Sequence, residues 1–117
     1  MADDAACLFC QIARGDTSAT VVFKGESVTA FRDISPQAPT HILIIPDQHI
    51  PGAASMTAEH EAIVGRLIRV AAQVARDAGI ENGGYRLIVN QGRDAGQSVD
   101  HLHVHLLGGR RLPVRLI

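Results

Sequence analysis

The sequence has 117 residues, of which 46% are hydrophobic and 20% are charged, and its formal net charge is -1. This length suits one small domain (1–117) with its own core, and the scattered, nearly balanced charges exclude the basic surface on which nucleic-acid binding depends. No apolar run reaches the roughly 20 residues of a membrane span, and the N-terminal MADDAACLFCQ lacks the cationic and apolar segments of a signal peptide. We therefore expect a cytoplasmic protein with no nucleic-acid or membrane partner.

The N-terminal part of the chain is expected to contain one short helix and three strands. Residues 7–14, CLFCQIAR, predict a helix that Gly15 ends, because glycine suits the left-handed turn after a helix. Residues 19–23 and 27–31 are predicted strands, joined by a short turn into a hairpin. HILIIP at 41–46 is rich in β-branched residues and bounded by prolines, which indicates a buried strand.

The longest predicted element is a helix that Thr57 can cap and Gly79 can end. Its apolar face has helical spacing and consists of Ile63, Val64, Leu67, Ile68, Ala71, Val74, Ala75 and Ala78. His60 lies on the polar face, where we expect it to be exposed and without a role. Residues 85–90, YRLIVN, and residues 101–107 are predicted strands.

The order of these elements indicates the fold class. Strands outnumber helices, and the early strands are too close together for crossover helices between them. The sequence therefore predicts an α+β fold, in which an antiparallel sheet packs against one long helix and is accompanied by the short N-terminal helix.

The last predicted strand contains half of the six histidines in the chain. Its sequence, DHLHVHLL at 100–107, places a histidine at every second position: His101, His103 and His105. Side chains alternate between the two faces of a strand, so the imidazoles share one face and the leucines and valine share the other, which packs in the core. Three alternating histidines are improbable on an ordinary solvated face, so we interpret theirs as a ligand-binding face.

A row of imidazoles could serve either metal binding or nucleophilic catalysis at phosphorus. Three metal ligands on one flat strand cannot by themselves surround a tetrahedral ion. A neutral imidazole, in contrast, attacks phosphorus without prior deprotonation and forms an adduct that water can hydrolyse, while a neighbouring imidazole donates to phosphate oxygens. The Gly-rich loop NQGRDAGQSVD at 90–100 adds backbone N–H groups that can cradle a phosphate, and the hydroxyl of Ser98. The pattern favours catalysis at phosphorus.

Two cysteines with C-x-x-C spacing, Cys7 and Cys10, indicate metal or redox chemistry in a reducing compartment. A thioredoxin-type motif expects a preceding strand, and none is predicted there; buried unpaired cysteines are the alternative. His49 and His101 can complete a Cys₂His₂ set suited to tetrahedral zinc. We favour a structural zinc site that pins the N-terminal helix to the strand before His103.

Several motifs, in order along the chain, resemble one known family. HLHVHLL matches the H-x-H-x-H pattern of the histidine triad family. FRDISPQAPTHILIIPDQHI, VNQG and GQSVDHLHVHLLGGR are similar to its Hint branch, the purine nucleoside phosphoramidases, and the resemblance covers about residues 7–111. It implies a histidine-triad fold, a homodimer, and hydrolysis of the P–N bond of adenosine 5'-phosphoramidate-like purine nucleotides through a nucleotidyl-histidine intermediate.

The resemblance also implies a role for each matching residue. His103 would be the nucleophile, and His105 and Ser98 would contact the phosphate and the leaving group. Asp33 would bond the ribose hydroxyls, as an acidic side chain suits a vicinal diol. The other expected contacts are Phe9, Ile12, Phe31 and Ile34 around the purine, Asn90 and Gln97 at the phosphate, and His41 behind the triad. A structural zinc ion is implied, with the ligands Cys7, Cys10, His49 and His101, the last of which also positions the nucleophile; catalysis itself needs no cofactor.

Two other functions stay open at this point. The other main branch of the family cleaves dinucleoside polyphosphates, although the GQSV stretch favours the Hint branch. The second alternative is a nucleotide-binding regulatory module with incidental turnover. The sequence departs from the Hint branch in two places: it ends in GGRRLPVRLI without the usual Trp-Pro-Pro tail, and Asp100 stands where an aromatic residue is common. The missing tail leaves the leaving group undetermined.

Overall fold

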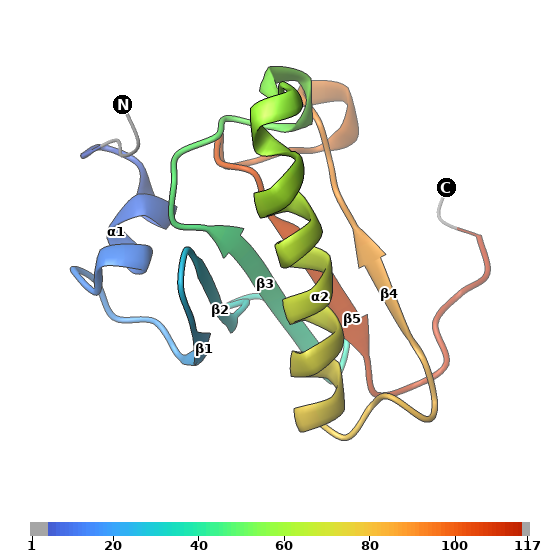
Figure 1. The fold of residues 1–117 in the computed structure, drawn as a ribbon. Helices are drawn as coiled ribbons and strands as arrows, with labels where there is room; N and C mark the ends of the chain where they lie inside the picture. The colour runs from blue at the N-terminus through green and yellow to red at the C-terminus, as the bar shows by residue number, and fades with distance from the viewer. Residues whose placement is uncertain (1–4, 116–117) are drawn as a thin grey trace.

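The structure, a computed structural model, describes residues 5–115, which form a five-stranded sheet and two α-helices (Figure 1). The strands are β1 (Val21–Lys24), β2 (Val28–Arg32), β3 (Thr40–Pro46), β4 (Tyr85–Ile88) and β5 (Val104–Gly108), in the sheet order β1-β2-β3-β5-β4. The helices are α1 (Leu8–Arg14) and α2 (Glu61–Asp77). All neighbouring strands are antiparallel, which confirms the predicted α+β fold. Within residues 5–115, neither helix has the length and hydropathy to cross a bilayer.

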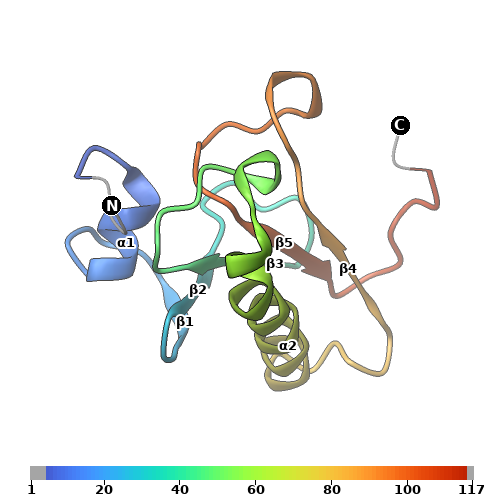
Figure 2. The same ribbon diagram turned by 45° about the horizontal axis from the view of Figure 1, so that its top comes forward.

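The two helices occupy different sides of the sheet. α2 runs across one face, whereas α1 stands beside the β1–β2 end (Figures 1 and 2). The apolar cluster under α2 includes Val28, Ala30, Ile42, Ile44, Val104 and Leu106 from the strands. The smaller cluster under α1 contains Phe9, Ile12, Phe31, Leu43 and Ile45. Residues two apart on one strand thus share a cluster, as the pleat of a strand requires.

α1 begins after Cys7, which acts as its N-cap because the Cys7 Sγ accepts the backbone N–H of Cys10 at 3.4 Å. Gly15 ends the helix with a φ of 81°, a left-handed conformation that glycine adopts without strain. Both ends agree with the predicted helix. With seven residues, α1 is too short to be stable alone, so its position depends on the contacts of its buried face.

A 3-10 turn, Ala58–His60, leads into α2, and Thr57 caps it by accepting the N–H of Glu59. The Nδ1 of His60 accepts the N–H of Thr57 at 2.9 Å, which completes a reciprocal cap. His60 is also half-buried. The prediction that His60 is exposed and without a role is therefore wrong, whereas Thr57 caps the helical segment as expected.

The buried face of α2 differs from the predicted face at Ile68, Val70 and Ala78. Its buried residues are Leu67, Val70, Ala71, Val74 and Ala75. Ile68, at the margin of this stripe, is 43% exposed, and Ala78 is the C-cap beyond the last helical turn, where it is exposed. Val70, at the opposite margin, is buried although it was not predicted, so the buried stripe is rotated slightly from Ile68 towards Val70.

β5 begins at Val104, so the strand predicted over 101–107 starts later than expected. The last pair between β3 and β5 is Ile44↔Val104. Pairing does not continue because Pro46, at the end of β3, has no N–H to donate. Other strand ends shift as well: β4 stops at Ile88 instead of residue 90, and β1 and β2 lie one or two residues later than predicted.

Residues 101–103 keep the alternation of a strand without strand pairing. Leu102 is buried in the cluster under α2. The rings of His101 and His103 lie on the other side, with centroids 5.9 and 5.1 Å from that of Phe9 in α1. The ring centroid of His105 is 5.0 Å from that of His103. The predicted histidine face is therefore confirmed.

Candidate active site

His103 is held by one ring nitrogen and keeps the other available. It is 5% exposed, and its Nδ1–H donates to the backbone carbonyl of His101 at 2.7 Å. A neutral imidazole carries one proton, so this hydrogen bond leaves Nε2 with a free lone pair. The edge-to-face contact with Phe9 fixes the orientation of the ring. His103 can therefore act as a nucleophile through Nε2.

A chain of hydrogen bonds determines the tautomer of His105. The backbone N–H of Gln37 donates to His41 Nδ1 at 3.0 Å, so the proton of a neutral His41 is on Nε2. This Nε2–H donates to His105 Nδ1 at 3.0 Å, which puts the proton of His105 on its own Nε2. His105 is thus an N–H donor beside the nucleophile, a role that suits binding of phosphate oxygens.

Both histidines of this pair stay neutral near pH 7. Burial, together with the neighbouring His103 and His41, lowers the pKa of His105 to about 4, and the charge of Asp33 opposes this shift. Burial also lowers the pKa of His41, again opposed by Asp33. The neutral state of the pair preserves the proton positions that the hydrogen bonds require.

A cavity of about 330 Å³ opens between α1, β2 and the loop before β5. It is lined by most of the predicted nucleotide contacts: Phe9, Ile12, Phe31, Asp33, Ile34, Ser98, His103 and His105. Ile34 is 96% exposed and stands at the rim. Leu8, Leu43 and Val99 also line the cavity and were missed in the sequence. In HILIIP only His41 differs from its apolar neighbours, and its alternation with Leu43 was the one signal that could have placed Leu43 on the histidine face.

Asp33 lines the cavity with a carboxylate that already has two contacts. Its Oδ1 accepts the N–H of Ser35 at 2.8 Å, and its Oδ2 lies 3.4 Å from His41 Nε2. Each oxygen keeps a lone pair for a further donor such as a ribose hydroxyl. Asp33, His41 and His105 are close enough together to chelate a metal ion. Because the Nε2 of His41 carries a proton in the hydrogen-bonded chain, this nitrogen has no lone pair to offer a metal ion.

Gln97 joins two loops and is not among the residues that line the cavity. Its Oε1 accepts a backbone N–H of its own loop at 2.8 Å, and its Nε2 donates to the carbonyls of Pro51 at 2.9 Å and Val99 at 3.1 Å. This side chain therefore positions the neighbouring Ser98, which does line the cavity. Asn90 is half-buried and also lies outside the cavity lining.

The four predicted metal ligands, Cys7, Cys10, His49 and His101, come together in one cluster. Their ligand atoms all lie within 4.8 Å of one another. The Sγ of Cys10 is 3.3 Å from His49 Nδ1 and 3.5 Å from His101 Nδ1, and the Sγ of Cys7 is 3.4 Å from that same His101 nitrogen. Tetrahedral zinc separates thiolate sulfur from imidazole nitrogen by about 3.6 Å, so the donor set fits this ion.

His101 links the metal-ligand cluster to His103. It is fully buried, and its Nε2–H donates to the carbonyl of Pro46 at 2.8 Å, which leaves the Nδ1 lone pair facing the cysteines. Burial lowers the pKa of His101, whereas the hydrogen bond to Pro46 and the charge of Asp47 raise it. The His101 carbonyl accepts the hydrogen bond of His103, so displacement of this segment would disturb both sites.

Comparison with known proteins relates these features to one family. The HIT domain family profile matches residues 14–112. The purine nucleoside phosphoramidase of Escherichia coli strain K12 is 54% identical over 105 residues, which cover 90% of this chain and 88% of that protein. The 14 kDa zinc-binding protein of Zea mays is 48% identical over 112 residues, which cover 94% of this chain and 87% of that protein.

Solved structures agree with these sequence matches. The HIT family hydrolase from Clostridium thermocellum has a TM-score of 0.94 and 40% identity, with 97% of this chain and 99% of that chain covered. The HIT family hydrolase from Legionella pneumophila Philadelphia 1 has a TM-score of 0.90 and 44% identity, with 92% and 96% covered. The fold and the family resemblance expected from the histidine motif are confirmed, and the chain belongs to the HIT family.

Proposed function

We propose that this protein is a nucleotide hydrolase that cleaves the P–N bond of purine nucleoside phosphoramidates, the activity named for its Escherichia coli relative. The proposal depends above all on the hydrogen bond from His103 Nδ1–H to the His101 carbonyl, which leaves Nε2 of a buried imidazole free beside a cavity of about 330 Å³. The apolar side chains of α1 and β2 suit a purine, and Asp33 suits the ribose hydroxyls.

In the first proposed step, His103 Nε2 attacks the phosphorus, a bond from phosphorus to the imidazole forms, and the bond from phosphorus to the leaving amine breaks. The leaving nitrogen takes a proton from solvent, while the neutral His105 Nε2–H and the Ser98 hydroxyl donate hydrogen bonds to it and to the phosphate oxygens. The His101 carbonyl stabilises the positive charge that develops on the His103 ring. Water then attacks the phosphorus, the bond from phosphorus to His103 Nε2 breaks, and the nucleoside monophosphate leaves, while the proton lost by the attacking water returns to solvent.

The loop over 90–100 contributes to phosphate binding in two ways. Ser98 reaches the cavity directly, and the backbone N–H groups around it can face phosphate oxygens. Gln97 acts by holding this loop against Pro51, whereas Asn90, at the start of the loop, lies outside the cavity lining.

Trapping of the covalent intermediate tests the proposal. Wild-type protein is incubated with a fluorogenic adenosine phosphoramidate, denatured rapidly under alkaline conditions, and analysed by peptide mass spectrometry. We expect an adenylyl group on His103 and none in the His103→Ala variant. An adduct on another residue would contradict the mechanism.

Competing substrates distinguish the alternative functions. Faster hydrolysis of diadenosine polyphosphates than of the phosphoramidate would favour the dinucleoside polyphosphate hydrolases. Tight binding of AMP without turnover of either substrate would favour the regulatory module.

We also propose that Cys7, Cys10, His49 and His101 hold a structural zinc ion. The proposal is supported by the donor distances, by the tautomer of His101, and by the 48% identity to a relative named as a zinc-binding protein. Four protein ligands leave no position for substrate, so the ion when bound would cross-link α1 to the segment before His103. Purified protein should contain about one zinc ion per chain, and Cys10→Ser should lose it and unfold at a lower temperature. Metal-free protein of full stability would leave the cysteines as ordinary core residues.

We further propose that the chain is a single domain that forms a two-fold homodimer through β4, in the cytoplasm, where its cysteines stay reduced. β4 is an edge strand that pairs only with β5 within residues 5–115, and Val89, which follows it, is 46% exposed. A second copy can pair with such an edge across a two-fold axis, in an interface that should bury more than about 1,000 Å². A mass measurement that finds only monomer at micromolar concentration would refute the dimer.

A further inference from the structure

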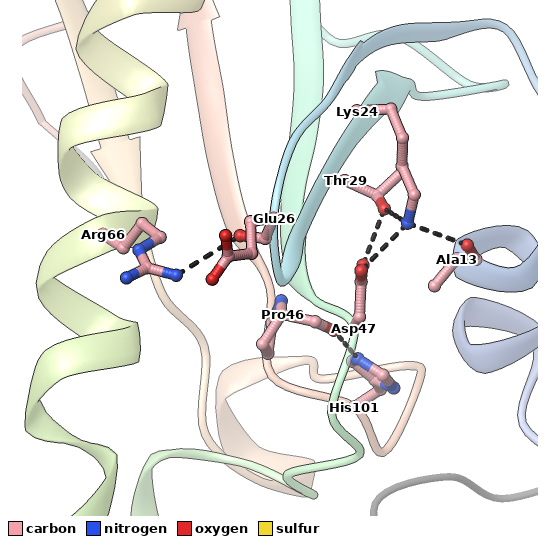
Figure 3. Close-up of polar contacts among 8 residues, drawn as sticks. All are labelled: Ala13, Lys24, Glu26, Thr29, Pro46, Asp47, Arg66 and His101. Carbon is pink, nitrogen blue, oxygen red and sulfur yellow. Dashed lines mark hydrogen bonds and ion pairs between the residues drawn. The ribbon is translucent and has the colours of Figure 1, made fainter.

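Lys24 in β1, Thr29 in β2 and Asp47 after β3 form a polar network (Figure 3). Asp47 directly follows Pro46, whose carbonyl accepts the hydrogen bond of the metal-ligand candidate His101. The Thr29 hydroxyl donates to Asp47 Oδ1 at 2.7 Å, and Lys24 Nζ donates to Thr29 Oγ1 at 2.8 Å and to Asp47 Oδ2 at 2.9 Å. Thr29 is fully buried, whereas the other two side chains are partly exposed. The Thr29 hydroxyl is thus both donor and acceptor, so the three side chains hold one another in place.

The network is attached to α1 at the end opposite the cysteines. Lys24 Nζ donates to the carbonyl of Ala13 at 2.9 Å, in the last turn of the helix (Figure 3). A cation at the C-terminal end of a helix donates a hydrogen bond to a carbonyl that lacks an intrahelical partner, and it interacts favourably with the helix dipole. Cys7 and Cys10 are at the other end of the same short helix, so anchoring its last turn restricts where their sulfur atoms lie.

The network is also attached to the segment that carries His49. The N–H of Asp47 donates to the carbonyl of Ser27 at 2.8 Å. This N–H and the Pro46 carbonyl belong to one planar peptide unit, so fixing one fixes the other. The Pro46 carbonyl accepts the Nε2–H of His101 at 2.8 Å (Figure 3). The side chain and the backbone of Asp47 together therefore hold the acceptor that determines the His101 tautomer.

We propose that Lys24, Thr29 and Asp47 are positioning residues of the metal site, which set the location of α1 and hold the Pro46 carbonyl that orients His101. This inference rests on the proposed zinc site. A partly exposed ion pair contributes little to stability, so the main effect of the network falls on ligand geometry. Loss of a direct hydrogen-bond partner of a metal ligand typically lowers metal affinity by about 10–100-fold, and because these three side chains act one bond further away, their effect should lie at the lower end of this range. The carboxylate of Asp47 also adds negative charge near a cation.

Transfer of zinc from the loaded protein to a chromophoric chelator measures this effect. Asp47→Asn should weaken zinc binding by about tenfold and Thr29→Val in the same direction, with far-UV circular dichroism unchanged. Thr29→Ser keeps the hydroxyl and should restore wild-type affinity. The matched control is Asp16→Asn, which removes a carboxylate paired with Arg14 at 2.8 Å but outside the network, and zinc affinity should not change.

Two results would overturn the proposal, and they differ in whether the zinc site itself is also refuted. Wild-type zinc affinity in both Asp47→Asn and Thr29→Val would refute the positioning role and leave the zinc site intact. Failure of the wild-type protein to hold zinc would refute both, but not the hydrolase, because the adduct on His103 is measured separately. If Thr29→Val disturbs the fold, Lys24→Met at its half-exposed position replaces it and should weaken zinc binding.

Discussion

The apolar cluster under α2 contains no histidine, whereas the face under α1 carries His41, His101, His103 and His105 among its apolar side chains. The same strands make both faces. The α2 face requires only complementary shape and hydrophobicity, but a buried imidazole on the α1 face also requires hydrogen-bond partners. Among residues 5–115, no buried side-chain nitrogen or oxygen lacks a partner. The comparison indicates that one face supplies stability and the other supplies chemistry, so substitutions on the two faces should have separable effects.

The largest separation is expected at the nucleophile. His103→Ala should lower kcat by at least about 1,000-fold, as loss of a covalent nucleophile typically does, because His105 presents a proton and not a free lone pair. The AMP affinity should stay near that of the wild type, because Phe9, Asp33 and the other side chains that line the cavity are unchanged. Steady-state kinetics and calorimetric titration with AMP measure both quantities. Turnover at a rate comparable to wild type would show that another group attacks.

The complementary substitution is Leu106→Ala, which lies one residue beyond His105 on the other face. Leu106 is fully buried under α2, so its truncation should lower the free energy of unfolding by about 2–5 kcal/mol. The kcat of the folded variant should stay near that of the wild type. Urea denaturation and kinetics on the same preparation provide the comparison. A large loss of kcat in the folded protein would mean that the faces are not independent.

A smaller effect is expected at the cavity rim. Asp33→Asn replaces an anionic acceptor by a neutral amide and should raise KM for ribonucleotide substrates by about tenfold. For the corresponding 2'-deoxy substrate, which lacks one hydroxyl, the rise in KM should be smaller. Kinetics with the two substrates give this ratio. An equal loss with both would indicate that Asp33 acts through its contact with His41, at 3.4 Å, and not through the ribose.

The smallest expected effect concerns pH. A histidine in the unfolded chain has a pKa of about 6.5, whereas burial lowers that of His105 to about 4 in the fold. Between these values the unfolded chain binds a proton that the folded protein excludes, so stability is lost as pH falls from about 6.5 towards 4. His105→Asn removes this dependence. From about pH 7.5 to about pH 5, the wild type should lose about 1 kcal/mol more stability than the variant, after allowance for solvent screening.

Urea denaturation of both proteins across this pH range, with zinc kept in excess, tests the expectation. Excess zinc keeps protonation of the metal ligands the same in the two proteins. Identical pH dependence in wild type and His105→Asn would show that His105 does not titrate differently in the folded and unfolded states.

Local patterns were sufficient for the fold but not for the ends of its elements. The alternation in DHLHVHLL and the helical spacing of α2 are strong signals, because each depends only on the geometry of its own segment. The start of β5 at Val104 depends instead on Pro46 in another strand. The capping role of His60 depends on a hydrogen bond from the N–H of Thr57, in a capping box where histidine replaces the usual Glu or Gln.

The candidate site shows the same contrast between features that a local sequence pattern predicts and features that depend on contacts with distant segments. His103 as nucleophile and the four metal ligands were predicted from spacing and from family resemblance; the structure brings the four ligand side chains together, and the role of His103 stays a prediction. The tautomer of His105 could not be read from the sequence, because it depends on the backbone N–H of Gln37 and on the loop conformation that delivers it to His41. The network of Lys24 and Asp47 joins residues far apart in the chain with no motif spacing.

The alternation of residues 101–106 between the two faces also limits how this segment can evolve. A substitution changes one side chain on one face, but insertion of a single residue turns every following side chain to the opposite face. An insertion before His103 would bring His103 and His105 under α2 and would expose Val104 and Leu106 to the cavity, so the core and the nucleophile would be lost in one event. Descendants of this sequence should therefore vary here by substitution alone, with insertions and deletions confined to the loops on either side.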